Sequence, residues 1–223
     1  MEGEPFLPLL PFPPLSWWAV YGQAKAPVID LAEGYNKQTL RNRLVLVDST
    51  GPFVLTLGLN HGFRREHPAF PMSKIKLSKH TPNQQHLKCI QTAYGKAPYF
   101  EHVMPELENL VAPASSSADP TIGEWAMTSI QMMLSWAGRP HHAVLSTHES
   151  PMKTQEYLDW RRTNWQDAQQ WFFPSYGQPF EDRLGFTPGL SGLDALFCLG
   201  PDWPSALASH QNPSSRPPTS NRF

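Results

Sequence analysis

Cysteine, charge and uninterrupted apolar runs are all scarce in this chain of 223 residues. Two cysteines are too few for a disulfide framework, so we expect a reducing compartment, the cytoplasm. Charged residues amount to 17%, below the usual ~25%, and the net charge is −1, which disfavours a nucleic-acid partner bound by a basic face. The apolar stretch 6–20 is interrupted by prolines, so we expect no insertion into a membrane.

Proline and aromatic residues are abundant instead. The chain has 24 Pro, 8 Trp, 12 Phe and 6 Tyr, and so many aromatic residues indicate a folded core. The last twenty or so residues are rich in Ser, Pro and Asn and contain few residues that would build a core. We therefore predict one domain over residues 1–203 and a disordered Pro/Ser-rich tail over residues 204–223.

The period of the apolar residues changes along the chain and predicts a mixed α/β fold. Runs of strand type lie at 27–31, 43–48, 53–59 and 142–146, and the second and third flank a turn-rich loop, which is a hairpin signal. Helices are predicted at 16–23, 84–94, 105–111, 122–137 and 192–199. Their expected caps are Ser16, Pro105 at a first position, the pair Thr121 and Glu124, and Ser191 with Asp194. We expect a single domain in which a small mixed sheet, built from the first half, packs with helices of the second half.

Sequence motifs for common cofactors are missing. There is no glycine-rich dinucleotide loop, no phosphate-binding P-loop, no Asp-x-Asp pair and no zinc-ligand spacing among the nine His. We predict neither a metal nor a cofactor. Only Trp160-Arg161-Arg162 has the composition that would stack on nucleic-acid bases, and the charge balance weighs against that function.

The densest polar cluster covers residues 33–43. Its side chains include a carboxylate, a phenol, amides and three cations, and they immediately precede a predicted strand. Arg41 and Arg43 would point to opposite faces of an extended chain, so one could hold an anionic ligand while the other anchors the loop. The alternative is a solvated connection between strands.

Four ordered motifs resemble those of the WbqC-like family, whose members are encoded among O-antigen and other surface-polysaccharide genes. They are Pro13-Pro14-Leu15-Ser16-Trp17-Trp18; Tyr35-Asn36-Lys37-Gln38-Thr39-Leu40-Arg41-Asn42-Arg43; His86 followed by Tyr94-Gly95-Lys96-Ala97-Pro98-Tyr99-Phe100; and Tyr176-Gly177-Gln178-Pro179-Phe180 followed by Phe186 to Phe197. Four residues depart from the family pattern: Ala32 stands where relatives often carry His, Gly34 replaces a polar residue, Gly192 a larger aliphatic residue and Cys198 an Asn. If that His is catalytic in relatives, this chain is an altered member.

The resemblance implies a transferase of surface-polysaccharide biosynthesis that moves an acyl or aminoacyl group to a nucleotide-activated amino sugar. The alternative is a non-catalytic protein of the same pathway that binds a glycan or a partner. Convergence of Glu33, Arg41 and His86 around one pocket would favour the enzyme, and their separation would favour the binding protein.

Candidate roles follow from what amide formation requires, which is a base for the amine proton and donors for the oxyanion. His86 is the first candidate base, because its ordinary pKa of ~6.5 is near working pH; it could equally be a core-edge histidine bonded to a backbone carbonyl. Glu33 is the second candidate, as the base or as the group that orients His86, and its alternative is a surface carboxylate paired with Lys37. The expected substrate-binding residues are Lys37, Arg41 and Arg43 for a pyrophosphate or carboxylate, Gln38 and Asn42 for sugar hydroxyls, and Tyr35 for stacking.

Overall fold

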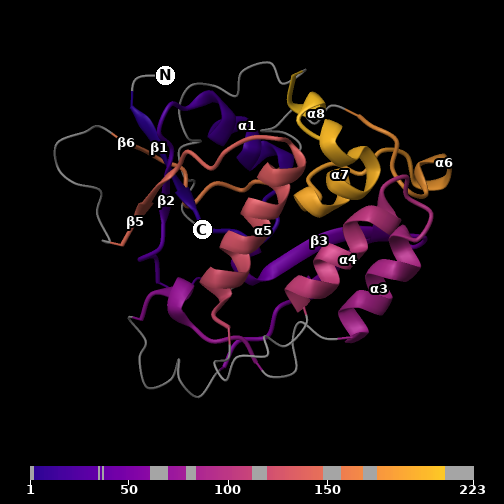
Figure 1. The fold of residues 1–223 in the computed structure, drawn as a ribbon, viewed down its shortest axis with the longest axis horizontal. Helices are drawn as coiled ribbons and strands as arrows, with labels where there is room; N and C mark the ends of the chain where they lie inside the picture. The colour runs from indigo at the N-terminus through magenta and orange to yellow at the C-terminus, as the bar shows by residue number, and fades with distance from the viewer. Residues whose placement is uncertain are drawn as a thin grey trace.

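The computed structural model of the protein describes residues 3–34, 36, 38–60, 70–78, 84–111, 120–147, 157–167 and 175–208. They form a mixed α/β fold with a four-stranded parallel sheet, a separate antiparallel hairpin and surrounding helices (Figure 1). The fold class predicted from the sequence is confirmed. None of the helices within these ranges is long and apolar enough to cross a membrane.

The parallel sheet joins two strands from the start of the chain to two from its second half. It consists of β1 (Glu4–Pro8), β2 (Val28–Asp30), β5 (Val144–Ser146) and β6 (Tyr157–Asp159), in the order β5-β2-β1-β6. All three pairings are parallel, so the carboxyl ends of the four strands lie at one edge. The expectation that the first half alone builds one sheet is therefore wrong, because strand pairing across the chain decides sheet membership. Strand β1 contains two prolines and has no period-two signal that would have announced it.

The second sheet is the predicted hairpin. Strands β3 (Arg43–Asp48) and β4 (Gly51–Thr56) pair antiparallel, with Val45 opposite Val54. On the outer edge of β3, side chains from other parts of the chain accept the backbone hydrogen bonds that a third strand would accept. The Val45 N–H donates to Ser191 Oγ over 3.0 Å, and the Val47 N–H donates to the Tyr94 hydroxyl over 3.1 Å.

The helices agree with the predicted segments more closely than their caps do. They are α1 (Leu15–Gln23), α3 (Gln84–Tyr94), α4 (Phe100–Val111), α5 (Ile122–Trp136), α6 (Glu181–Leu184), α7 (Gly192–Leu199) and α8 (Ser205–Ala208), with 3₁₀ turns at Leu40–Asn42, Met72–Lys74 and Gly200–Asp202. The Thr121 and Glu124 capping box of α5 is confirmed. Helix α8 lies within the stretch predicted as a tail; residues 209–223 lie outside the described residues, so the tail stays a prediction.

Two predicted caps are wrong, and a third, Ser191, is confirmed in position but does not cap with its side chain. Helix α4 begins at Phe100, which leaves Pro105 inside it. Ser16 lies inside α1, and its hydroxyl donates to the Trp165 carbonyl oxygen over 2.6 Å. Ser191 caps α7 in position only, because its hydroxyl accepts the Val45 N–H.

An aromatic cluster holds α1 against the rest of the domain. Trp17, Trp18 and Tyr21 are all buried, and Trp17 stacks on Tyr21 with ring centroids 5.1 Å apart. Trp18 contacts Trp203 near α8 with a centroid distance of 5.0 Å. This packing explains the high tryptophan content, since each ring buries a large apolar area.

Candidate functional site

The carboxyl edge of the parallel sheet carries the densest group of charged side chains that the structure describes. Asp30 ends β2, Glu33 follows it after two residues, and Arg161 follows β6. In open α/β sheets, ligands bind outside the carboxyl ends of the strands, at the point where the strand order reverses. Here β1 lies between β2 and β6, so this group of charges lies at that point.

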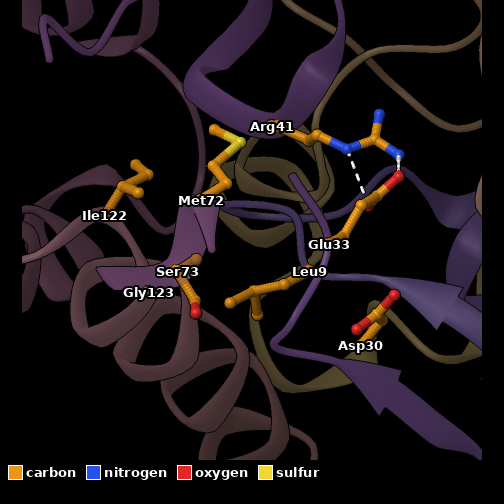
Figure 2. A pocket seen from close by; sticks show the side chains of 9 residues that line it. Leu9, Asp30, Glu33, Arg41, Met72, Ser73, Ile122 and Gly123 are labelled. Atoms are coloured by element: carbon orange, nitrogen blue, oxygen red, sulfur yellow. Dashed lines mark hydrogen bonds and ion pairs between the residues drawn. The ribbon is translucent and has the colours of Figure 1, made fainter. Parts of the chain in front are cut away.

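Glu33 and Arg41 form a two-pronged ion pair at this edge (Figure 2). The Arg41 Nε atom lies 2.9 Å from Glu33 Oε2, and Arg41 Nη2 lies 2.5 Å from Oε1. The side chain of Arg41 is 5% exposed and that of Glu33 19%. Arg41 belongs to a 3₁₀ turn, so the prediction that Arg41 and Arg43 point to opposite faces of an extended chain is wrong for Arg41. Of the two arginines, Arg41 is the one that anchors the loop.

Arg161 connects this ion pair to the sheet. Its carbonyl oxygen accepts a 2.8 Å hydrogen bond from Arg41 Nη2, and its own guanidinium donates to Asp30 Oδ2 over 2.9 Å. The guanidinium also forms paired hydrogen bonds with Asp159 and lies 4.5 Å from the centroid of the Phe6 ring. The two arginines and three carboxylates form one connected network across β1, β2 and β6.

Burial changes the proton affinity of the carboxylates in this network. Removal from water raises the pKa of Glu33 above its ordinary value, and Arg41 only partly opposes the shift. Burial acts on Asp159 in the same sense, but the hydrogen bonds and charge of Arg161 outweigh it and lower the pKa of Asp159. Of these two carboxyl groups, Glu33 is therefore the one that binds a proton more tightly than usual.

The cavity beside Glu33 and Arg41 is small. Figure 2 shows Leu9, Asp30, Met72 and the start of α5 around it, and its volume is about 10 Å³, room for roughly one water molecule. It adjoins a larger groove of about 370 Å³, with which it shares Ser73 and Gly123 as lining residues. The Ser73 hydroxyl donates to the carbonyl oxygen of Leu31.

His86 is not among the described residues that line this cavity. Its Nε2 atom lies 3.2 Å from the carbonyl oxygen of Thr56, which faces Arg43 across the hairpin. A contact between the ring and a backbone carbonyl is what the non-catalytic interpretation expected. The structure thus brings Glu33 and Arg41 together and leaves His86 outside their cavity.

The remaining predicted binding residues have different surroundings. Asn42 is buried, and its Nδ2 atom donates to the Leu57 carbonyl oxygen over 2.9 Å. Arg43 is half-buried, and its Nε atom is buried without a hydrogen-bond partner. Gln38 is exposed and has a positive φ of 58°. Tyr35 and Lys37 lie outside the described residues, so the expected pairing of Glu33 with Lys37 stays a prediction; the partner that the structure shows for Glu33 is Arg41.

A second polar cluster is centred on Asp194, whose side chain is fully buried. The Tyr94 hydroxyl donates to Asp194 Oδ1 over 2.7 Å, and Oδ2 accepts from the Tyr176 hydroxyl over 2.5 Å and from Gln178 Nε2 over 3.0 Å. The expectation that Asp194 serves the cap of its helix is therefore wrong. Burial raises the pKa of Asp194, with the three donors opposing the shift.

Sequence reasoning missed Asp30, Arg161 and Ser73 in the charged site. Asp30 carried a detectable signal, since a carboxylate that ends a short apolar run of strand type invites a search for its partner. Arg161 and Ser73 carried none, because their partners are 131 and 42 residues away in the chain. Within the described ranges, no three His, Cys, Asp or Glu side chains gather in a way that would hold a metal ion.

Fold and site together define an α/β protein with an arginine–carboxylate network at the carboxyl edge of a small parallel sheet. The model of the WbqC-like protein family matches residues 12–156, and the chain belongs to this family. The matched part includes Glu33 and Arg41 and ends before Arg161 and Asp194. No curated protein and no solved structure matched the chain.

Proposed function

We propose that the protein is a transferase of surface-polysaccharide biosynthesis that moves an acyl or aminoacyl group to the amine of a nucleotide-activated amino sugar. The resemblance to the WbqC-like family supplies the pathway and the substrate class. One observation carries the chemistry: a largely buried glutamate, Glu33, whose pKa is raised, lies at the sheet edge where α/β proteins bind ligands.

The reaction that fits this site is amide formation from an activated acyl group, such as a thioester or an acyl phosphate. The amine nitrogen attacks the carbonyl carbon, so that a C–N bond forms and the bond from carbon to the leaving group breaks. Glu33 takes the proton that the amine loses and returns it to the leaving group. A raised pKa suits both steps, since the carboxylate must accept a proton and then release it.

The arginines have distinct roles in this proposal. Arg41 positions Glu33, because both its Nε and its Nη2 are engaged in the ion pair. Arg43 is the better candidate for an anionic group of the substrate, since its buried Nε has no hydrogen-bond partner. Gln38 and Asn42 remain proposed contacts for sugar hydroxyls, Tyr35 remains a proposed stacking residue and Lys37 a further cation. His86 remains a proposed base, which would require a substrate that reaches the Thr56 end of the hairpin.

Calorimetric titration with a panel of nucleotide-sugars tests the substrate class. We expect the parent to bind a nucleotide-activated amino sugar and Arg43→Ala to bind it about ten- to a hundredfold more weakly, as for loss of a charge-assisted contact. Arg139→Ala, which removes an exposed arginine after α5, is the matched control and should bind like the parent. Absence of binding by the parent would rule out the nucleotide-sugar substrate, and equal affinity for all three proteins would rule out the role of Arg43.

Glu33→Gln separates the enzyme from a binding protein. The variant keeps a side chain that accepts from Arg41 but cannot take a proton, so we expect turnover to fall at least a hundredfold while nucleotide-sugar affinity stays within a few-fold. Mass spectrometry of the sugar product gives the readout. One observation, the position of His86 outside the cavity, favours the alternative of a non-catalytic binding protein. This alternative predicts that the parent and Glu33→Gln both bind the nucleotide-sugar and that neither turns it over.

A further inference from the structure

The groove beside the Glu33 cavity has walls of a distinct chemical type. Its volume is about 370 Å³, within the usual range for small-molecule sites. Its apolar residues are Leu31, Pro71 and Met127, which are aliphatic, proline and thioether side chains, and no aromatic ring is among its described lining residues. Nucleic-acid bases are commonly held by stacking on aromatic rings, so this lining favours an aliphatic chain.

The charged residues of the groove favour a ligand that carries a negative charge. Lys74 is exposed, and no ion pair of its ammonium group occurs within the described part of the chain. The carboxylate of Glu124, the acidic residue of the lining, is engaged by the backbone and hydroxyl of Thr121 in the capping box of α5. Thr121 takes up hydrogen-bonding capacity of the Glu124 carboxylate, whereas the Lys74 ammonium group has no ion pair among the described residues and can bind an anionic group.

The groove is continuous with the candidate site. Ser73 and Gly123 line both the groove and the Glu33 cavity, and Leu31 and Thr147 directly follow β2 and β5 at the carboxyl edge. A ligand in the groove therefore lies next to the cavity that Glu33 lines. Figure 2 shows Ser73 and Gly123 on the side of the cavity formed by the start of α5.

We propose that the groove binds an aliphatic acyl chain that bears an anionic group, with the chain along Leu31, Pro71 and Met127 and the anionic group beside Lys74. This inference rests on the proposed function only in naming that chain as the acyl donor. It narrows the donor from acyl or aminoacyl to an aliphatic acyl group.

Three probes of equal chain length test the inference by calorimetry with the full chain: octanoate, octylammonium and 1-octanol. Octanoate is expected to bind more tightly than octylammonium. Lys74→Gln should lower the affinity for octanoate about fivefold, as for loss of an exposed ion pair, and leave the affinity for 1-octanol unchanged. Lys76→Gln is the matched control, because Lys76 is also exposed but does not line the groove. Octylammonium that binds as tightly as octanoate would overturn the inference, and so would equal effects of the two lysine variants.

Met127→Glu places a carboxylate in the groove and should abolish binding of octanoate. Thermal unfolding verifies that the variant folds. The methyl chemical shifts of Met127 and Leu31 in the parent report octanoate binding independently of the variant. Octanoate that leaves both methyl signals unmoved would place the ligand elsewhere and overturn the inference. Failure of the proposed function is distinct, since it would appear as absent nucleotide-sugar binding while octanoate still occupies the groove.

Discussion

The hydroxyl of Tyr94 donates a 2.7 Å hydrogen bond to Asp194, which lies 100 residues further along the chain. The same hydroxyl accepts the backbone N–H of Val47 on the outer edge of β3. One tyrosine at the end of α3 therefore connects the hairpin to α7. Within the described part of the chain no cation bonds to this carboxylate, and two tyrosine hydroxyls and one amide stabilise it.

Loss of either tyrosine hydroxyl should destabilise the protein. Tyr94→Phe and Tyr176→Phe each leave the buried carboxylate of Asp194 one donor short, and hydrogen bonds to charged groups contribute about 1.5–3 kcal/mol. Tyr99→Phe is the control, since the Tyr99 ring packs near Gly200 and its hydroxyl has no hydrogen bond to any of the described residues. Urea unfolding monitored by tryptophan fluorescence measures all three, and a loss for Tyr99→Phe equal to the others would refute this assignment.

Stability should depend on pH through Asp194. Its pKa is raised in the folded protein, so the native state binds the proton more tightly than the unfolded chain does. The resulting stabilisation is fully present below the ordinary aspartate pKa of ~3.9 and is lost as pH rises through the folded pKa. The free energy of unfolding should therefore fall on going from about pH 4 towards neutrality.

Asp194→Asn isolates this effect, because the variant cannot titrate at that position and Glu33 remains in both proteins. We expect a smaller fall with pH in the variant than in the parent. The asparagine also presents an N–H group to one of the three donors, so its absolute stability should be lower. Urea unfolding at pH 4, 5, 6 and 7 gives the comparison; parallel pH profiles would contradict the prediction.

The Glu33 and Arg41 ion pair should show strong coupling in a double-mutant cycle. The single variants Glu33→Leu and Arg41→Met each leave one member of the pair without its counter-charge, and breaking such a buried pair costs about 3–5 kcal/mol. The double variant Glu33→Leu with Arg41→Met should recover much of that loss, because a buried apolar pair needs no partner charge. Strictly additive effects in thermal unfolding would show that the two side chains do not interact.

Gly123 should tolerate no side chain. A Cβ atom there would lie 2.3 Å from the Ser73 carbonyl oxygen, which is backbone and cannot rotate away. We expect Gly123→Ala to destabilise the protein by about 1–3 kcal/mol. Gly22→Ala in α1 is the matched control, since nothing lies within 4 Å of its Cβ position, and it should stabilise the helix by about 0.5–1 kcal/mol. Calorimetric melting of both variants tests whether Gly123→Ala lowers the stability of the protein and Gly22→Ala raises it.

Local features were predictable because their causes lie within a few residues. The Thr121 and Glu124 capping box needs only one helical turn, and the hairpin of 43–56 needs two β-type runs and a turn. The cluster of charges at 33–43 also pointed to the site, since Glu33 and Arg41 are only eight residues apart. Their pairing with each other rather than with a ligand depends on the 3₁₀ turn at Leu40–Asn42, which the polar pattern does not indicate.

The sequence by itself determined the α/β class, most helix positions and the segment that contains the charged site. Only the tertiary structure decided that Asp30 meets Arg161, that Asp194 is buried among tyrosines, and that His86 contacts a backbone carbonyl. The physical reason is that helices and hairpins arise from interactions between near neighbours, whereas a parallel sheet brings together strands separated by long connections. Side chains at its carboxyl edge acquire their partners, and with them their pKa shifts, only once those strands have paired.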